Sequence, residues 1–276
     1  MSIKLMYITN RVDVAKLAQD CGVDWIFVDL EFQGKADRQS GRDTVISCHN
    51  VDDVRALRSV VDRSSLLVRI NPIGEWSEIE VNKVIESGAD IVMLPFFKSK
   101  EEVEKFVAYV GGRARTCLLL ETPEAVDDIE NILSIGGVDY VHIGLNDLHI
   151  AYGMKFMFEL LADGTVDRLA KIIGGFGIPF GFGGVARMAE RVPPGASIIA
   201  EHYRVGSSQV ILSRSFCNTN SASLEDVADS FRSGIEELRA VERALIEKPA
   251  EFFTENRLYV RDEIFRVARE GERVEA

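Results

Sequence analysis

Three charged residues stand at the ends of apolar segments of the chain. Glu121 follows the run TCLLL, Asp147 follows DYVHIGLN, and Arg69 lies within SLLVRIN. A charge in such surroundings needs an oppositely charged partner or a metal ion. Two carboxylates that face each other suit a hard cation such as Mg²⁺ or Mn²⁺, with waters and substrate as the other ligands, and suit zinc less well. The alternative is a carboxylate pair that Arg69 alone neutralises.

Other polar residues interrupt apolar runs in the same way. Asp29 and Glu31 end one run, and Asn71 and Arg214 end two others. Any one of them, taken alone, is explained by helix capping or loop anchoring. Together they predict one polar site, in which Asp29 and Glu31 bind the substrate or hold Arg69 in place.

Eight apolar runs rich in β-branched residues alternate with eight segments of helical period. The runs cover residues 4–10, 24–31, 65–71, 90–95, 116–122, 139–147, 179–185 and 209–216. Near-continuous apolar runs are typical of strands buried on both faces of a parallel sheet. Eight strand–helix pairs favour a (β/α)8 TIM barrel over an open parallel sheet. A TIM barrel has its site at the carboxyl ends of its strands, where the charged residues stand.

The alternation predicts a barrel domain over residues 1–246 and a helical arm over residues 247–276. Pro249 interrupts the last helical segment, and the arm carries apolar patches suited to packing on the barrel or on a neighbouring subunit. Helix N-caps are predicted at Asn50, Ser99, Thr122 and Ser223.

Composition restricts the partners of the protein. The 276 residues include 32 Lys and Arg against 44 Asp and Glu, a net charge of −12, which disfavours binding to nucleic acid or to an anionic membrane. The sequence contains no run of 18 apolar residues and no secretory signal pattern, and its four cysteines have no CxxC spacing. We expect a cytoplasmic protein with reduced cysteines. A small anionic substrate remains compatible with the net charge, because local charge can oppose it.

Five ordered motifs resemble those of the HpcH/HpaI aldolase and citrate lyase β-subunit family of the phosphoenolpyruvate/pyruvate superfamily. They read DWIFVDLE, VRINP, GADIVMLP, LLLETPEAV and VDYVHIGLNDL, and weaker agreement continues to residue 216. The resemblance implies a (β/α)8 barrel and an enzyme that cleaves or forms a carbon–carbon bond next to a 2-oxo acid or an acyl thioester.

The resemblance also implies roles for individual residues. Glu121 and Asp147 would bind Mg²⁺ or Mn²⁺, and Arg69 would contact the 2-oxo group of the substrate. Cleavage next to a 2-oxo acid leaves an enolate, and its oxygen would lie between the cation and Arg69. Backbone amides near the substrate carboxylate are predicted at Gly88, Gly144 and Thr122, each of which also suits an ordinary turn or cap.

One position departs from the family pattern. The aldolase branch has a proton-transfer histidine directly after the glutamate of the first motif, the citrate-lyase branch has an acidic residue there, and this chain has Phe32. His49, in the segment ISCHN before a helix, is the candidate catalytic residue for proton transfer, with a solvated loop residue as the alternative. His149 has a similar alternative. His142 is predicted to lie in the core or barrel wall, and His202 on a helix surface.

The leading interpretation is a divalent-metal-dependent carbon–carbon lyase of the class II aldolase type, acting through a pyruvate-like enolate. One alternative is a citrate-lyase-like enzyme acting on a CoA thioester. Another is a non-catalytic protein that binds metal and a 2-oxo acid, because Phe32 replaces the expected proton-transfer residue.

Two further expectations concern the surroundings of the site. The polar loop over residues 32–44 is interpreted as a lid or a solvated loop, with basic residues at Lys35, Arg38 and Arg42. Arg187 and Arg214 are expected to add positive charge at the mouth of the barrel, the end where the strands have their carboxyl ends. The family resemblance implies a homo-oligomer, with possible exchange of the last barrel helix between subunits.

Overall fold

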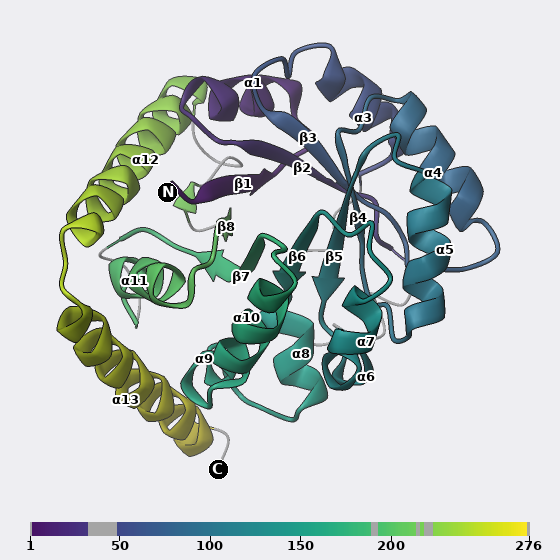
Figure 1. The fold of residues 1–276 in the computed structure, drawn as a ribbon. Helices are drawn as coiled ribbons and strands as arrows, with labels where there is room; N and C mark the ends of the chain where they lie inside the picture. The colour runs from purple at the N-terminus through teal and green to yellow at the C-terminus, as the bar shows by residue number, and fades with distance from the viewer. Residues whose placement is uncertain (1, 33–48, 189–192, 214–215, 218–222, 275–276) are drawn as a thin grey trace.

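The computed structural model describes residues 2–32, 49–188, 193–213, 216–217 and 223–274, and its centre is a closed barrel of parallel strands (Figure 1). The strands are β1 (Lys4–Ile8), β2 (Trp25–Asp29), β3 (Ser65–Arg69), β4 (Ile91–Leu94), β5 (Arg115–Leu120), β6 (Tyr140–Ile143), β7 (Phe180–Val185) and β8 (Gln209–Leu212). Hydrogen bonding between β1 and β8 closes the sheet. The predicted (β/α)8 barrel is therefore confirmed, and the open parallel sheet is excluded.

Helices surround the barrel (Figure 1). They are α1 (Val12–Asp20), α3 (Val51–Arg58), α4 (Ser77–Glu86), α5 (Lys100–Val110), α6 (Pro123–Asp127), α7 (Ile129–Leu133), α8 (Leu145–Ala151), α9 (Glu159–Ala162), α10 (Thr165–Gly175), α11 (Gly195–Val205), α12 (Leu224–Ile246) and α13 (Ala250–Val274). Asn50 and Ser223 form capping boxes, as predicted. The side chain of Ser99 caps no backbone amide of α5, contrary to the prediction, and Glu102 accepts the amide of Lys98 there.

Alternate side chains along each strand face the barrel interior. An apolar cluster fills it, made of Met6, Trp25, Phe27, Leu67, Ile91, Met93, Cys117 and Leu119. The other set of strand side chains packs against the helices in a second, larger cluster. Two residues beyond Phe27, Leu67 and Leu119 stand Asp29, Arg69 and Glu121. The alternation that buries the apolar side chains thus brings these charged ones to one end of the barrel.

The strands end earlier than the apolar runs suggest. Sequence analysis extends the sixth strand to residue 147, whereas β6 ends at Ile143 and Asp147 lies in the first turn of α8. Glu31 and Asn71 each follow their strand by two residues. Polar side chains at the mouth therefore come from the segments after the strands as well as from the strands themselves.

The last two helices differ in what they cover. Helix α12 packs against α11 and α1 and completes the ring around its own barrel, and α13 continues along α11 and α9 (Figure 1). The segment predicted as an arm is helical over Ala250–Val274. Among the described residues, no helix has the length and apolar character needed to cross a membrane.

Candidate active site

Arg69 lies at the centre of the mouth between two buried carboxylates. Its Nε and one terminal nitrogen donate to the two oxygens of Asp29, each at 2.8 Å, and its other terminal nitrogen lies 3.3 Å from Oε2 of Glu31. Both acidic side chains are almost fully buried, whereas the side chain of Arg69 keeps 12% of its surface exposed. Burial disfavours the charged guanidinium, but Asp29, followed by Glu31 and Glu121, outweighs this and raises the pKa of Arg69.

The pairing of β2 with β3 produces this arrangement. Asp29 and Arg69 are directly opposite in the register of the two strands, and both face the interior. The amide of Glu31 donates to Oδ1 of Asp29 at 3.2 Å, which turns the chain so that Glu31 also reaches the guanidinium. Asp29 and Glu31 therefore hold Arg69 in place, one of the two roles that the sequence predicts for them.

Glu121 follows β5 and is only 3% exposed. Its Oε1 accepts the amide of Phe96 at 3.1 Å, and Phe96 adopts a left-handed backbone conformation (φ 51°) that non-glycine residues rarely adopt. Burial raises the pKa of Glu121 well above its usual value of 4.5, against the pull of Arg69, and the charges of Asp147 and Glu31 raise it further. Burial and the neighbouring negative charges therefore both disfavour the ionised form of the Glu121 carboxyl group.

Asp147 reaches the same region from α8. The helix begins after Gly144, and a Cβ atom at that position would lie 2.8 Å from Cβ and 2.9 Å from Oε2 of Glu121. Gly144 therefore lets the turn between β6 and α8 pass directly over Glu121. Asp147 is half-buried in the first turn of α8, and its charge acts on Glu121.

A divalent cation fits the charges of this site. Asp29 and Glu31 pair with Arg69, and the charges of Asp147 and Glu31 add to burial in raising the pKa of Glu121. Among the described residues, no group of three or more His, Cys, Asp or Glu side chains is placed to hold a metal ion. Two carboxylates completed by waters and a substrate are the usual protein contribution to a Mg²⁺ site.

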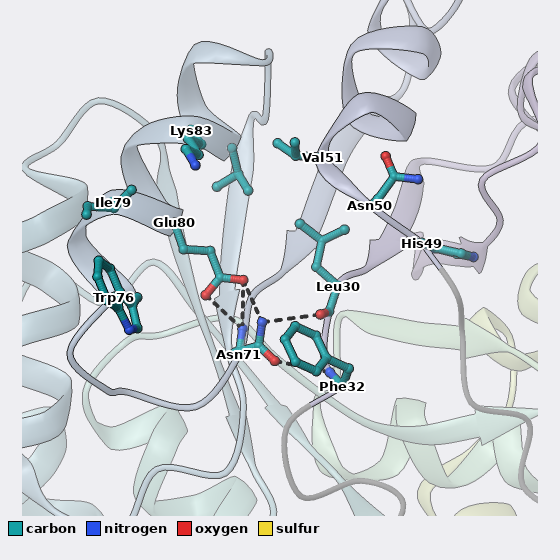
Figure 2. A pocket seen from close by; sticks show the side chains of 11 residues that line it. Leu30, Phe32, His49, Asn50, Val51, Asn71, Trp76, Ile79, Glu80 and Lys83 are labelled. Carbon is teal, nitrogen blue, oxygen red and sulfur yellow. Dashed lines mark hydrogen bonds between the residues drawn. The ribbon is translucent and has the colours of Figure 1, made fainter.

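A side-chain network fixes the segment on both sides of Glu31. The amide of Asn71 accepts from the backbone of Phe32 at 3.1 Å and donates to the carbonyl of Leu30 at 3.3 Å (Figure 2). Glu80 on α4 in turn accepts from the Nδ2 atom of Asn71 at 2.8 Å. These residues also line a pocket of about 410 Å³ between the ends of β2 and β3 and the helices α3 and α4 (Figure 2).

The histidines take different positions. Nδ1 of His49 accepts the amide of Asp29 at 3.0 Å, so His49 lies beside the residue that holds Arg69. His149 is buried in α8, with Nδ1 against the carbonyl of Leu145. The prediction that His202 lies on the surface is wrong, because it is fully buried and its ring stacks on Phe182 at 3.8 Å.

Two other predicted roles, those of Gly88 and Arg187, need correction. Gly88 follows α4 and precedes β4, at the end of the barrel opposite the mouth, and serves the turn there with φ at 103°. It is therefore not a substrate-binding residue. The hydroxyl of Thr122 caps α6 and donates to the carbonyl of Phe97 at 2.6 Å, so the predicted cap is present, and the predicted contact of its backbone amide with a substrate stays a prediction. Arg187 bonds to Ser230 of α12 and so adds no charge at the mouth.

Four predicted basic residues lie outside the described part of the chain, and two contacts of the site were not predicted from the sequence. Lys35, Arg38, Arg42 and Arg214 lie outside the described residues. The contact of Phe96 with Glu121 was not predicted, since no local pattern marks a left-handed phenylalanine. Asn71 was recognised as polar at a strand end, a signal that could have suggested its bonds to Leu30 and Phe32.

A (β/α)8 barrel with acidic side chains and an arginine at the carboxyl ends of its strands has the architecture of a TIM-barrel enzyme. A sequence model of the HpcH/HpaI aldolase/citrate lyase family matches residues 5–158, more than half of the chain. The protein belongs to this family.

Individual relatives agree with this membership. A hydroxypyruvate/pyruvate aldolase of Sagittula stellata is 27% identical over 181 residues, a match that spans 55% of this chain and 65% of the relative. The chain thus covers a little under two thirds of that relative. A 4-hydroxy-2-oxovalerate aldolase of Novosphingobium aromaticivorans is 24% identical over 191 residues, or 58% of this chain and 68% of the relative.

The fold is similar to that of solved structures. The crystal structure of an HpcH/HpaI aldolase from Desulfitobacterium hafniense superposes with a TM-score of 0.61 and 16% sequence identity, covering 90% of this chain and 95% of that one. At this identity the likeness supports the fold.

Proposed function

We propose that this protein is a divalent-metal-dependent carbon–carbon lyase that cleaves or forms a bond next to a 2-oxo acid through a pyruvate-like enolate. The observation that carries the proposal is the placement of Arg69. Asp29 and Glu31 fix it, and its charge lies close enough to Glu121 to oppose the rise in the pKa of that group. A fixed guanidinium beside an acidic pair places positive charge where an enolate oxygen develops.

Metal binding and stabilisation of the enolate oxygen would fall to different residues of the chain. Glu121 and Asp147 would hold Mg²⁺ or Mn²⁺, and the bound ion supplies Lewis-acid chemistry at the 2-oxo acid. Arg69 stabilises the developing negative oxygen from the other side. Because Asp29 binds Arg69 through two parallel bonds, the guanidinium needs no reorganisation during the reaction.

His49 is the proposed proton-transfer residue in place of the missing histidine at Phe32. Its Nδ1 accepts the amide of Asp29, so the neutral ring carries its hydrogen on Nε2. In this state His49 offers a hydrogen-bond donor at Nε2, and for His49 to accept a substrate proton Nδ1 would have to release the amide of Asp29.

The substrate is tested by comparing reactions on the same preparation. Free oxaloacetate and 4-hydroxy-2-oxo acids, assayed beside malyl and citramalyl thioesters with Mg²⁺ or Mn²⁺, separate the aldolase from a citrate-lyase-like enzyme. We expect turnover of the free acids only. The names of both curated relatives, which are aldolases of 2-oxo acids, favour this outcome. Turnover confined to thioesters would reject it.

Turnover, and not binding measured by calorimetry, distinguishes the enzyme from a non-catalytic binding protein. Both predict that the protein binds Mn²⁺ and that pyruvate binds more tightly with Mn²⁺ present, and only the enzyme turns over. Replacement Glu121→Gln should abolish metal binding. We further propose that the protein is a cytoplasmic homo-oligomer with a small-molecule substrate. Light scattering on the purified protein measures its oligomeric state.

A further inference from the structure

Two polar side chains enter the barrel interior below the mouth. His142 lies on β6 two residues beyond Tyr140, and Gln209 lies on β8 two residues before Ile211. Tyr140 and Ile211 both pack on the apolar cluster inside the barrel, so the alternation of each strand directs His142 and Gln209 inward as well. Both residues are 1% exposed.

Each side chain makes one hydrogen bond, and that bond determines the chemistry of its other polar atom. Nε2 of His142 lies 3.1 Å from the carbonyl of Gly183, which can only accept, so Nε2 carries the ring hydrogen and Nδ1 presents a lone pair. Nε2 of Gln209 donates to the carbonyl of Val141 at 2.9 Å, which leaves Oε1 as an acceptor. Within the described part of the chain, neither Nδ1 of His142 nor Oε1 of Gln209 has a hydrogen-bond partner.

The two unpartnered acceptors belong to one region of the interior. In the register of the sheet, His142 and Gln209 both stand opposite Gly181 of β7. The side-chain amide of Gln209 reaches across β7 and donates to the carbonyl of Val141, which precedes His142 in the chain. A Cβ atom at Gly181 would lie 2.4 Å from Cγ of Gln209, so this passage requires glycine. Gly184 likewise contributes no side chain to the barrel wall.

Two acceptors cannot bond to each other, and burying either one without a donor is costly. A guest with two donor hydrogens satisfies both. We propose that one water molecule is bound inside the barrel between Nδ1 of His142 and Oε1 of Gln209, donating one hydrogen bond to each. The proposal is independent of the reaction that the mouth catalyses.

A neutral guest fits this position better than an ammonium or alkali cation. The positive charge of Arg69, on the neighbouring layer of the barrel, disfavours a second cation nearby and contributes to lowering the pKa of His142, after burial, to about 4. Water also supplies the required two donors while keeping its own oxygen available as an acceptor. With this water in place His142 stays neutral, and Arg69 keeps the positive charge directed to the mouth.

The test combines crystallography with ¹⁵N NMR. A crystal structure that resolves ordered waters should show a peak about 2.7–3.2 Å from both atoms. The chain has only four histidines, so His142→Phe identifies the His142 signals directly. We expect the Nε2–H tautomer, with Nδ1 shifted upfield from the position of an unbonded nitrogen. An empty density map, an unbonded Nδ1, or a peak that depends on added ammonium would overturn the proposal.

A double-mutant cycle gives a second readout. His142→Phe and Gln209→Leu should each lower Tm by at least about 2–4 °C, because each leaves one acceptor buried without its bridge. The double variant should lose less than the sum, since it removes both acceptors. Additive losses would contradict a shared water. If the double variant fails to fold, the NMR of the wild-type protein still decides the question.

Discussion

The guanidinium of Arg69 donates two hydrogen bonds side by side to the two carboxylate oxygens of Asp29, each at 2.8 Å. Two parallel bonds fix the orientation of the guanidinium as well as its position. The remaining terminal nitrogen faces Glu31, so Arg69 keeps its charge although it is largely buried. A fixed positive group of this kind is suited to stabilising an anion that forms during a reaction.

Arg69→Lys should separate the charge of this residue from its geometry. Lysine keeps the charge but cannot make the two parallel bonds, so we expect turnover to fall at least about 100-fold. The free energy of unfolding should fall by about 1–3 kcal/mol, because Asp29 loses hydrogen bonds while buried. Steady-state kinetics and urea unfolding measure these effects. Arg115→Lys, in an exposed pair with Asp139, is the control and should leave both unchanged. Equal kinetics in both variants would show that Arg69 is not needed for catalysis.

Glu121→Gln should change the pH dependence of stability in the metal-free protein. The pKa of Glu121 is raised in the folded state, so its contribution to stability is fully present below pH 4.5 and is lost as the pH rises through the folded-state pKa. The variant has no such group, and its stability should decline less above pH 4.5. Thermal unfolding across pH 4 to 8 measures the difference, with Mn²⁺ expected to stabilise the wild type but not Glu121→Gln.

Glu124→Gln is the matched control for this change. Glu124 lies three residues further along, in the first turn of α6, and is exposed beside Lys98. We expect this variant to keep the pH profile of the wild type and its stabilisation by Mn²⁺. An identical response of the two variants would show that Glu121 has no special electrostatic role.

Gly144→Ala should disturb Glu121 without changing any charge. The new Cβ would lie within 3 Å of Cβ and Oε2 of Glu121, closer than carbon atoms tolerate. We expect weaker Mn²⁺ binding by about 10-fold or more and a lower Tm. Gly174→Ala, within α10 and with no atom within 4 Å of the new Cβ, should keep Mn²⁺ affinity and unfold at the same or a higher temperature. Unchanged calorimetric affinity in Gly144→Ala would contradict the placement of the metal beside Glu121.

Asn71→Ala should loosen Glu31 without removing it. The variant loses the bonds to Leu30 and Phe32, so Glu31 and Arg69 become less ordered, and we expect kcat to fall about 10- to 100-fold. Asn131→Ala on the exposed face of α7 provides the comparison. A full kcat in Asn71→Ala would show that these bonds serve only the pocket wall and not the site.

The barrel was predictable because the patterns that indicate its strands and its helices are both local in the sequence. Apolar runs spaced by amphipathic segments report the strands, and the same alternation carries Asp29, Arg69 and Glu121 to one end. Strand ends were overestimated, since the apolar character of residues 144–148 belongs to the first turn of α8. Apolar spacing over so few residues does not distinguish a strand from a buried helix.

Positions that depend on three-dimensional contacts were not predictable. Gly88 is an exception, because the order of a helix before it and a strand after it, which the sequence already indicates, places it away from the mouth. His202 was predicted at the surface because its helix is amphipathic, whereas its ring is covered by Phe182. The bonds of Phe96 and Asn71 join segments that follow paired strands, β4 with β5 and β3 with β2, so they depend on the register of those strands.

The most direct test of the proposed function is the exchange of pyruvate methyl protons in D₂O, followed by ¹H NMR. We expect exchange that needs Mg²⁺ or Mn²⁺, exceeds the rate with the metal alone, persists in Glu124→Gln and is lost in Glu121→Gln. Binding of metal and pyruvate without exchange would contradict enolate chemistry and identify a binding protein. Exchange that persists in Glu121→Gln would contradict the assignment of the metal site.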